Sequence, residues 1–328
     1  MNKTYILIIK KDDFDFKEIL GIPLLYYHFL RARNQNSSLF LVTDDQKYID
    51  FFNNCKLEKE ISDNCYITLS NCFEKDVKFN LTKKEALKII ESKEIKEKEF
   101  IIRTNKDFYS FRNIVKEYIN FKFIENGVDI ENISTTYIGP EVNIEKGTKI
   151  TGDTHIYGKS CIGKNNLISS SYIENTNIKD DNKILNSHIV GAMIGCKNEI
   201  GPFCRMRGKA VIDNECVLGN FVEIKSSNIK DHVKIKHLSY IGDTFIEKNV
   251  NIGCGFVTAN YDGKRKYPTT IEENVFVGCN TTIVSPVTLK ENCFIAAGSV
   301  ITKDVEKNDL AIARSRQINK TNYVKQKK

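Results

Sequence analysis

An aliphatic residue recurs at every sixth position through much of the second half of the chain. One unbroken run contains Ile138, Ile144, Ile150, Ile156, Ile162 and Ile168. A second contains Ile271, Val277, Ile283, Leu289, Ile295 and Ile301. Between them the series continues, with some steps of five residues, through Ile173, Ile178, Ile184, Ile189, Ile194, Ile200, Met206, Ile212, Leu218, Ile224, Ile229, Ile235, Ile241, Ile246 and Ile252. A period of six matches neither an α-helix nor an alternating β-strand, so it restricts the chain to a repeat architecture.

This period predicts a parallel β-solenoid, in which each hexad supplies one short strand and a turn, and three hexads complete a triangular coil. The aliphatic residue of each hexad then points into a central stack. Residues 138–305 would form roughly nine coils of about 18 residues each. The series breaks between Gly253 and Thr270, and the break contains the polar segment NYDGKRK at 260–266. We expect this insertion to leave the coil as a loop, because such loops commonly carry binding residues.

The first third of the chain has a different pattern. Short apolar runs at 5–10, 39–43, 66–70 and 100–104 are typical of strands, and 24–32 and 84–95 are typical of helices. Strands that alternate with helices favour a small α/β domain with a largely parallel sheet. We therefore predict an α/β domain over 1–106, a linker over 107–134 with its helix at 108–126, the solenoid over 135–306 and a basic tail over 307–328.

The composition excludes several classes of protein. Of the 328 residues, 41% are hydrophobic and 10% aromatic, which excludes wholesale disorder. No run approaches the ~18 apolar residues of a membrane helix, so we expect a soluble, cytoplasmic protein without a membrane partner. The 49 Lys and Arg lie close to 42 Asp and Glu, so the net charge of +7 indicates a solvated surface rather than nucleic-acid binding. The ten cysteines are dispersed without a CxxC pair, which favours buried free thiols over disulfides.

Six motifs follow one another in the solenoid region. They are IGPFCRMR at 200–207, GNFVEIK at 219–225, HLSYIGD at 237–243, NYDG at 260–263, VFVG at 275–278 and IAAG at 295–298. Together they closely resemble the acetyltransferase half of the bacterial bifunctional N-acetylglucosamine-1-phosphate uridylyltransferase/glucosamine-1-phosphate acetyltransferase family, from about residue 112 to residue 314. The resemblance implies a left-handed parallel β-helix and a homotrimer with active sites between neighbouring subunits. It also implies acetyl transfer from acetyl-CoA to glucosamine-1-phosphate in the synthesis of UDP-N-acetylglucosamine, a cell-wall precursor.

This reaction needs a general base, because an ammonium group has no lone pair with which to attack a thioester. An imidazole titrates near neutral pH, and the resemblance places the family's base at His237 and the carboxylate that orients it at Glu223. It places at Asn260 and Tyr261 the residues that hold the substrate near the thioester, where an amide donor also stabilises developing oxyanion charge. The implied catalytic set is therefore His237, Glu223 and Asn260.

The phosphate of the sugar is a dianion, which calls for a pocket of convergent cations. The resemblance implies that Arg207, Lys225 and Lys266 bind the phosphate and the sugar. Tyr240 and Asn251 match further sugar contacts of the family.

Acetyl-CoA is expected along the outer groove of the last coils. The family's cofactor-contact positions correspond to Cys254, Tyr261, Cys279, Ala297 and Arg314. Cys254 stands where alanine is usual, and Cys279 stands where serine is usual. Backbone contacts survive both changes, but a thiol at 279 is a poorer hydrogen-bond donor than a hydroxyl. The resemblance implies no metal for this step.

The front of the chain departs from the family. A uridylyltransferase holds nucleotide phosphates in a glycine-rich loop directly after its first strand, whereas residues 10–17 (KKDDFDFK) contain no glycine. The front is also shorter than in the family. We therefore expect a degenerate, Rossmann-like nucleotidyltransferase remnant that has lost uridylyl transfer. Two alternatives stay open: acetylation of another amino sugar or nucleotide-linked sugar, and a non-catalytic trimer that partners a separate nucleotidyltransferase.

Overall fold

The computed structural model describes residues 4–8, 18–19, 22–23, 38–42 and 105–324. The chain divides into two compact units, Met1–Val115 and Lys116–Lys328. In the first unit, β1 (Thr4–Ile8) pairs in parallel with β4 (Ser38–Val42), and β2 (Glu18–Ile19) pairs antiparallel with β3 (Ile22–Pro23). The parallel pair agrees with the strands predicted at 5–10 and 39–43. The segment 10–17 and the elements predicted at 24–32, 66–70, 84–95 and 100–104 lie outside the described residues.

Helix α4 (Asn105–Glu125) agrees with the linking helix expected at 108–126. The buried amide of Asn120 donates to the Thr136 carbonyl at 3.0 Å, which ties the helix to the first coil. The helix ends at Glu125, and Gly127 follows with a φ of +88°, which allows the N–H groups of residues 127 and 128 to reach back to the last turn. Three apolar side chains of its C-terminal half pack against the core: Ile119, Phe123 and Ile124. Among the described residues, no helix is long and apolar enough to span a membrane.

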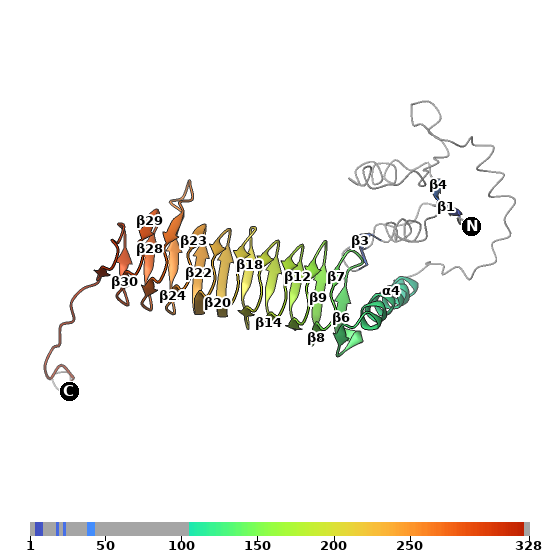
Figure 1. Cartoon of the computed structure of the whole chain (residues 1–328), viewed down its shortest axis with the longest axis horizontal. Coiled ribbons are helices and arrows are strands. Elements are labelled where there is room, and N and C mark those ends of the chain that lie inside the picture. Colours follow the sequence, from blue (N-terminus) through green and yellow to red (C-terminus); the bar gives the residue numbers. More distant parts are fainter. Residues whose placement is uncertain (1–3, 9–17, 20–21, 24–37, 43–104, 325–328) are drawn as a thin grey trace, which may run out of the picture. The chain divides into compact units, whose positions relative to one another are not determined.

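The second unit is a parallel β-solenoid of the left-handed β-helix type (Figure 1). Its first coils contain β5 (Asp129–Ile130), the 3₁₀-helix η2 (Ile133–Thr135), β6 (Thr136–Ile138), β7 (Asn143–Ile144), β8 (Lys149–Thr151), β9 (Thr154–Tyr157), β10 (Cys161–Ile162), β11 (Leu167–Ser169), β12 (Tyr172–Glu174), β13 (Asn177–Ile178), β14 (Lys183–Leu185), β15 (His188–Val190) and β16 (Met193–Ile194). The middle coils contain β17 (Glu199–Ile200), β18 (Arg205–Arg207), β19 (Val211–Ile212), β20 (Val217–Lys225), β21 (Asn228–Ile229), β22 (Lys234–Gly242), β23 (Thr244–Ile246), β24 (Asn251–Ile252) and β25 (Val257–Ala259). The last coils contain β26 (Thr269–Ile271), β27 (Phe276–Val277), β28 (Thr282–Val284), β29 (Val287–Leu289), β30 (Phe294–Ile295), β31 (Val300–Ile301) and β32 (Leu310–Ala311).

One face of the solenoid is a nine-stranded sheet that takes one strand from each coil, from β7 to β29. The other strands form a nineteen-stranded sheet, and the pairings in both sheets are parallel. Residues paired on consecutive coils stand 16 to 18 positions apart in most of the solenoid, as when Cys161 pairs with Asn143 and Asn177. The spacing is 20 between β5 and β8 at the start of the solenoid. Nine strands on one face agree with the predicted number of coils. The strand ladder runs from Asp129 to Ala311, slightly beyond the predicted span of 135–306 at both ends.

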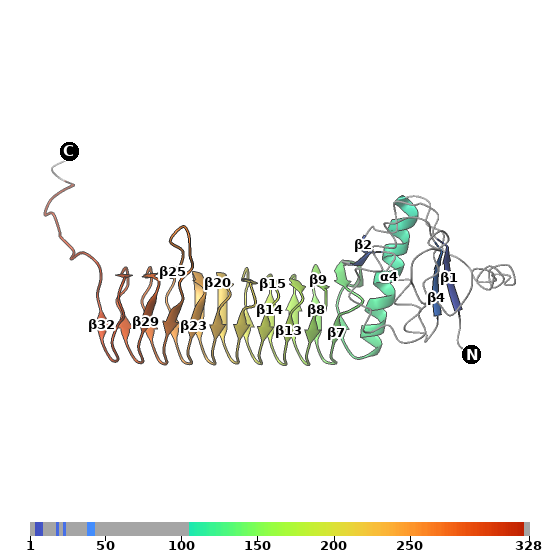
Figure 2. The same ribbon diagram turned by 90° about the horizontal axis from the view of Figure 1, so that it is seen from above.

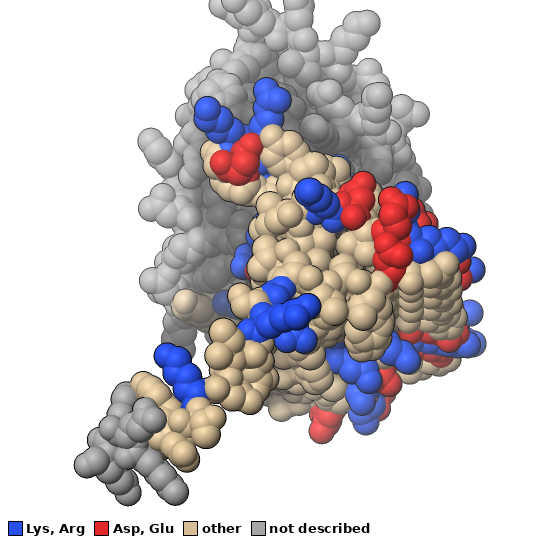
Figure 3. Space-filling view, turned by 90° about the vertical axis from the view of Figure 1, so that its left-hand side faces the viewer, with Lys and Arg blue, Asp and Glu red and all other residues tan. Residues whose placement is uncertain are grey.

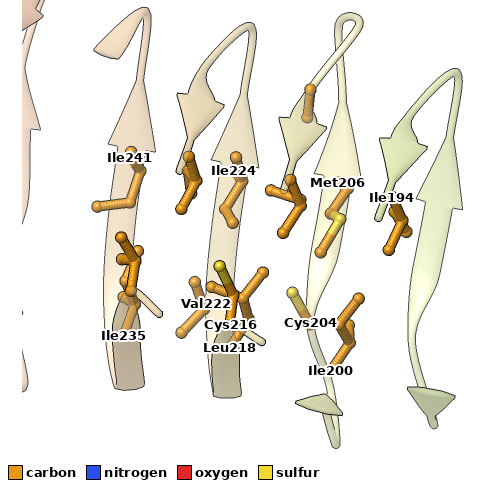
Figure 4. Close-up of a cluster of buried hydrophobic side chains, with 14 of the residues drawn as sticks. Ile194, Ile200, Cys204, Met206, Cys216, Leu218, Val222, Ile224, Ile235 and Ile241 are labelled. Carbon is orange, nitrogen blue, oxygen red and sulfur yellow. The ribbon is translucent and has the colours of Figure 1, made fainter. Parts of the chain in front are cut away.

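The core consists of the aliphatic residues of the six-residue series, which stack coil on coil. Every member of the series is at most 4% exposed, so the predicted inward stack is confirmed. One ladder runs through Ile144, Ile162, Ile178 and Ile194. Figure 4 shows the same stacking in the middle coils, where Met206 continues a ladder of isoleucines. Each fully buried aliphatic side chain contributes about 1.5–3 kcal/mol, so the stack accounts for much of the stability of the solenoid.

The insertion leaves the coil later than the sequence pattern indicates. β25 still pairs with β28, and Thr258 takes the ladder position of that coil. Its hydroxyl is buried and accepts the Gly242 N–H at 2.8 Å, so a polar residue replaces the aliphatic one without an unpaired group. Thr244 pairs with Thr269, 25 positions later rather than 16 to 18. The extra residues form the 260–267 loop, which stands out from the row of coils beside β25 (Figure 2).

The seven described cysteines are free thiols. Burial raises the pKa of Cys204 and Cys216 to about 12 and that of Cys293 to about 11. The prediction of buried thiols is wrong for Cys161 and Cys279, which are exposed because strand edges and corners also carry outward positions. The other three cysteines lie outside the described residues.

Charged side chains of both signs are interspersed over the face that Figure 3 shows. Ion pairs join successive coils, for example Lys230 with Asp213 at 3.0 Å and Lys290 with Glu306 at 2.6 Å. Pairs at such exposed positions contribute about 1 kcal/mol or less. This distribution agrees with the solvated, mixed-charge surface expected from the sequence.

Candidate active site

Five residues of interest occupy the same corner of the solenoid on successive coils. We call them the corner row: Asn220, His237, Cys254, Cys279 and Ala297. The first two are direct partners in β20 and β22. The last four each stand two positions after a ladder residue, and these ladder residues pair with one another: Ile235, Ile252, Val277 and Ile295. The predicted base and three predicted cofactor-contact positions therefore lie in one line.

The corner row is open to solvent over most of its length. His237, Cys279 and Ala297 are exposed, and Cys254 is half-buried. The fourth predicted cofactor contact, Arg314, is exposed and lies beside the end of the row. Its Cδ is 3.6 Å from the point where a Cβ at Gly298 would stand. The row can therefore accept an extended ligand along backbone groups, with a guanidinium at its far end.

A cationic cluster lies on the face that adjoins this corner. Lys225 contacts the carboxylate of Asp243, with an Nζ to Oδ2 distance of 3.4 Å, and its side chain is only 13% exposed. The side chain of Lys266, on the 260–267 loop, lies next to that of Lys225, and the neighbouring positive charge lowers the pKa of Lys266. The pKa of Lys225 is raised, because Lys266 in its neutral form can accept a hydrogen bond from the Lys225 ammonium and because the Asp243 carboxylate lies close by. Two neighbouring ammonium groups repel each other, so an anion bound between them would lower the electrostatic energy of this site.

The third predicted cation, Arg207, is held by Glu223. Its Nε and Nη2 both lie 2.7 Å from the same carboxylate oxygen. Strand register places Arg207 beside Lys225 on the next coil, so the three predicted phosphate ligands belong to one cluster. The acidic partners hold the cations in place before any ligand arrives.

Tyr240 and Asn260 join this cluster through Gly242. A Cβ at Gly242 would lie 2.6 Å from the Tyr240 hydroxyl and 2.7 Å from the Asn260 Nδ2, so both side chains cover this glycine. Asn260 is 5% exposed and donates to Asp243 at 2.6 Å. Glycine is therefore required at 242 for space rather than for an unusual backbone conformation.

One expected contact is not formed within this chain. Glu223 was expected to orient His237, but its carboxylate is bound to Arg207 instead. The imidazole Nδ1 of His237 lies 3.0 Å from Oδ1 of Asn220, its neighbour on the preceding coil. Asn220 is not among the predicted site residues, although it belongs to the GNFVEIK motif and stands one coil, 17 positions, before His237.

Of the two other predicted residues, Asn251 lies away from the cluster, whereas Tyr261 forms an antiparallel bridge with Lys266 of the cluster. Asn251 pairs with Lys234 and Phe276, on the face of the Ile252 ladder rather than that of the cationic cluster. Tyr261 is 60% exposed on the 260–267 loop and donates to the Gly263 carbonyl at 2.7 Å. One copy of the chain therefore brings together most of the predicted set, but not Asn251.

Three large apolar side chains lie at the same corner as the corner row. Phe203, Phe221 and Leu238 are each 55–56% exposed, and the two phenylalanine rings stack with centroids 5.3 Å apart. Their φ angles are +62°, +57° and +39°, a left-handed conformation that costs a branched or bulky residue about 1–2 kcal/mol. We call these three residues the apolar stripe. Exposed apolar groups held at such a cost indicate a contact surface.

Among the residues that the structure describes, no group of three or more His, Cys, Asp and Glu side chains is placed to hold a metal ion.

Comparison with known proteins adds independent information. Residues 268–303 match the family model described as bacterial transferase hexapeptide (six repeats). The chain is 42% identical to the bifunctional protein GlmU of Staphylococcus haemolyticus, over 64% of this chain and 47% of that protein. It is 45% identical to GlmU of a Geobacillus species, over 64% of this chain and 46% of that protein. The chain thus spans about half the length of the curated relatives it matches, and the match covers their C-terminal half.

Solved structures of the same kind were also found. One is LpxA, a UDP-N-acetylglucosamine acyltransferase from Bacteroides fragilis, which is 17% identical in sequence. The match covers 53% of this chain and 70% of the LpxA chain, with a TM-score of 0.30. The fold and the family model define the chain as a hexapeptide-repeat β-solenoid. The relatives confirm the resemblance of this solenoid to the C-terminal half of GlmU.

Proposed function

We propose that this chain transfers an acetyl group from acetyl-CoA to the amine of glucosamine-1-phosphate, which gives N-acetylglucosamine-1-phosphate for UDP-N-acetylglucosamine synthesis. The observation that carries this proposal is the placement of His237 in the corner row, beside a face with three convergent cations. A base, an extended groove and an anion site are the three parts that this reaction requires.

The cationic cluster supports a sugar phosphate as acceptor. Lys225 and Lys266 contact each other, and Arg207 lies one coil away. A phosphate dianion between them replaces like-charge repulsion by charge-assisted hydrogen bonds. Tyr240 and Asn260, which cover Gly242, are proposed to contact the sugar ring.

His237 is proposed as the general base. The substrate amine attacks the carbonyl carbon of the thioester, and its proton passes to the imidazole. The C–S bond then breaks and the coenzyme A sulfur leaves, taking up a proton. The amide of Asn260 is proposed to help stabilise the oxyanion, and its hydrogen bond to Asp243 holds it in place. Glu223 is assigned to Arg207 in this scheme rather than to the base.

Acetyl-CoA is proposed to lie along the corner row. Cys254, Cys279 and Ala297 offer backbone groups to the pantetheine arm, and Arg314 offers its guanidinium to the phosphates. Tyr261, on the exposed loop, is proposed to close over the thioester end. No residue of this scheme calls on a metal ion.

The chain is proposed to act as a homotrimer. The apolar stripe leaves three large side chains in contact with water, and Asn251 lies on a face away from the cationic cluster. A second copy packed on the stripe would cover these side chains and could present its own Asn251 to the site. Light scattering of the full chain tests this assembly.

The front unit is proposed to have lost uridylyl transfer. Residues 10–17 contain no glycine, the residue type that lets backbone N–H groups approach a phosphate closely. A separate nucleotidyltransferase would then complete UDP-N-acetylglucosamine. Magnesium-dependent uridylyl transfer by the full chain would overturn this part of the proposal.

The test is release of the coenzyme A thiol by the purified full chain in the presence of both substrates. His237→Ala is expected to lower turnover on the order of 10²–10⁴-fold, which is the usual contribution of a general base. His232→Ala is a matched control, because His232 is also an exposed corner histidine but pairs with Glu215 at 3.3 Å. Competition with other amino sugars and nucleotide-linked amino sugars identifies the acceptor. Full turnover by His237→Ala would refute the mechanism.

A further inference from the structure

The imidazole of His237 has one side-chain partner of defined geometry. Its Nδ1 lies 3.0 Å from Oδ1 of Asn220. An amide oxygen can only accept, so Nδ1 must carry the proton of this hydrogen bond. In a neutral imidazole the other nitrogen, Nε2, then holds the lone pair. This is the tautomer that a base needs if Nε2 faces the substrate.

The register of two long strands keeps this pair together. Asn220 and His237 are partners within β20 and β22, which stay paired on both sides of the corner. Asn220 is half-buried, whereas His237 is exposed. The less mobile amide can therefore hold the ring of the more exposed imidazole.

Glu223 is not positioned to do this work. Its paired residue on the next coil is Tyr240, three positions beyond the Asn220–His237 pair. Three residues of strand correspond to about 10 Å. Both short contacts of the Glu223 carboxylate go to Arg207.

We propose that Asn220 is the positioning residue of His237, and that it sets both the ring orientation and the tautomer of the base. This inference rests on the proposed acetyl transfer. Two residues of one motif then have separate roles. Glu223 orients Arg207, which is proposed to bind the phosphate, and Asn220 orients the base, His237. A neutral amide orients the imidazole without adding a charge that would favour its protonated form.

The experiment compares Asn220→Ala and Asn220→Asp with the wild-type chain. Asn228→Ala is the matched control, because Asn228 is an exposed strand residue of the same coil on the opposite sheet. The readouts are kcat, both KM values, the pH dependence of kcat, and the tautomer of His237 in ¹⁵N-histidine-labelled protein. Circular dichroism confirms that each variant is folded.

Asn220→Ala is expected to lower kcat on the order of 10–10²-fold with KM values within about twofold, and to give a mixture of His237 tautomers. Asn220→Asp is expected to keep the Nδ1–H tautomer and most of kcat. Its acidic limb should move to higher pH, because a carboxylate stabilises the imidazolium. The control should match the wild type.

The inference is overturned if Asn220→Ala keeps kcat within twofold of the wild type, or if its His237 tautomer is unchanged. A wild-type chain without acetyl transfer would instead refute the proposed function. In that case the ¹⁵N spectra of the wild type and of Asn220→Ala still decide whether Asn220 sets the tautomer.

Discussion

Replacing Gly242 with alanine would separate the sugar-phosphate site from the stability of the solenoid. The new Cβ would lie 2.6 Å from the Tyr240 hydroxyl and 2.7 Å from Asn260 Nδ2, and ordinary contact begins at 3.4 Å. Both side chains must therefore move by several tenths of an ångström. Gly242 is not among the positive-φ glycines, so its backbone accepts alanine without strain.

The size of the effect follows from the hydrogen bond that is displaced. Asn260 donates to Asp243 at 2.6 Å, and a shift of this size stretches that bond to the edge of the usual hydrogen-bond range and weakens it. A hydrogen bond to a charged group contributes about 1.5–3 kcal/mol, which corresponds to roughly 10- to 150-fold in an equilibrium constant. We expect kcat/KM for glucosamine-1-phosphate to fall by up to this factor. The KM for acetyl-CoA should change little, because the corner row is untouched.

The assay is thiol release at varied concentrations of each substrate, together with thermal unfolding. Gly219→Ala is the contrasting variant, because its Cβ would overlap the backbone carbonyl of Lys236 rather than a side chain. It is expected to lower the Tm strongly, whereas Gly242→Ala is expected to lower the Tm only by the few degrees that a weakened hydrogen bond costs and to lower kcat/KM for the sugar selectively. Wild-type kcat/KM for the sugar in Gly242→Ala would refute the assignment of Tyr240 and Asn260 to this site.

Three further predictions follow from the same contacts. Phe221→Asn should stabilise the monomer by about 1 kcal/mol, because asparagine tolerates a left-handed backbone, and it should weaken the trimer. Thermal unfolding measures the first effect and light scattering the second. A trimer mass that is unchanged at low protein concentration would contradict the role of Phe221 in the interface. Because the pKa of Lys266 is lowered, this lysine loses its charge at a lower pH than an ordinary lysine, so the Kd of the sugar phosphate should rise as the pH increases towards 10.5. Calorimetry over this pH range should show tight binding throughout for Lys266→Arg. A wild-type Kd that does not change with pH would contradict the role of Lys266 in the cluster. Iodoacetamide should label Cys161 and Cys279 faster than buried Cys204, whose pKa is raised to about 12. Acetyl-CoA should protect Cys279 but not Cys161 from labelling. Equal protection of both, measured by peptide mass spectrometry, would refute the binding of acetyl-CoA along the corner row.

The coil architecture could be predicted from the sequence because one residue type repeats at one period. Each member of the aliphatic series lies in the core, and the shorter steps in the series appear as shorter coils, as between Ile162 and Ile178. The end of the pattern at Ile252 was misleading. Thr258 continues the ladder there, because its hydroxyl accepts the N–H of Gly242. A polar ladder residue is invisible to a pattern of aliphatic residues.

The site could be predicted less completely, because its contacts join residues on different coils. His237 and the cations stood in recognisable motifs. The partner of His237 depended on which residue the coil length brings beside it, and coils vary from 16 to 25 residues. The apolar stripe was also not predictable, since Phe221 and Leu238 adopt a left-handed conformation that their residue types rarely adopt.

The central claim is that this solenoid acetylates the amine of a sugar phosphate. The most direct measurement incubates the full chain with acetyl-CoA labelled with ¹³C in the acetyl group and with glucosamine-1-phosphate, and identifies the product by mass spectrometry and NMR. We predict N-acetylglucosamine-1-phosphate with the label in an amide, formed by the wild type and the His232→Ala control but not by His237→Ala. Absence of labelled amide from the folded wild-type chain, or its formation at an equal rate by His237→Ala, would contradict the claim.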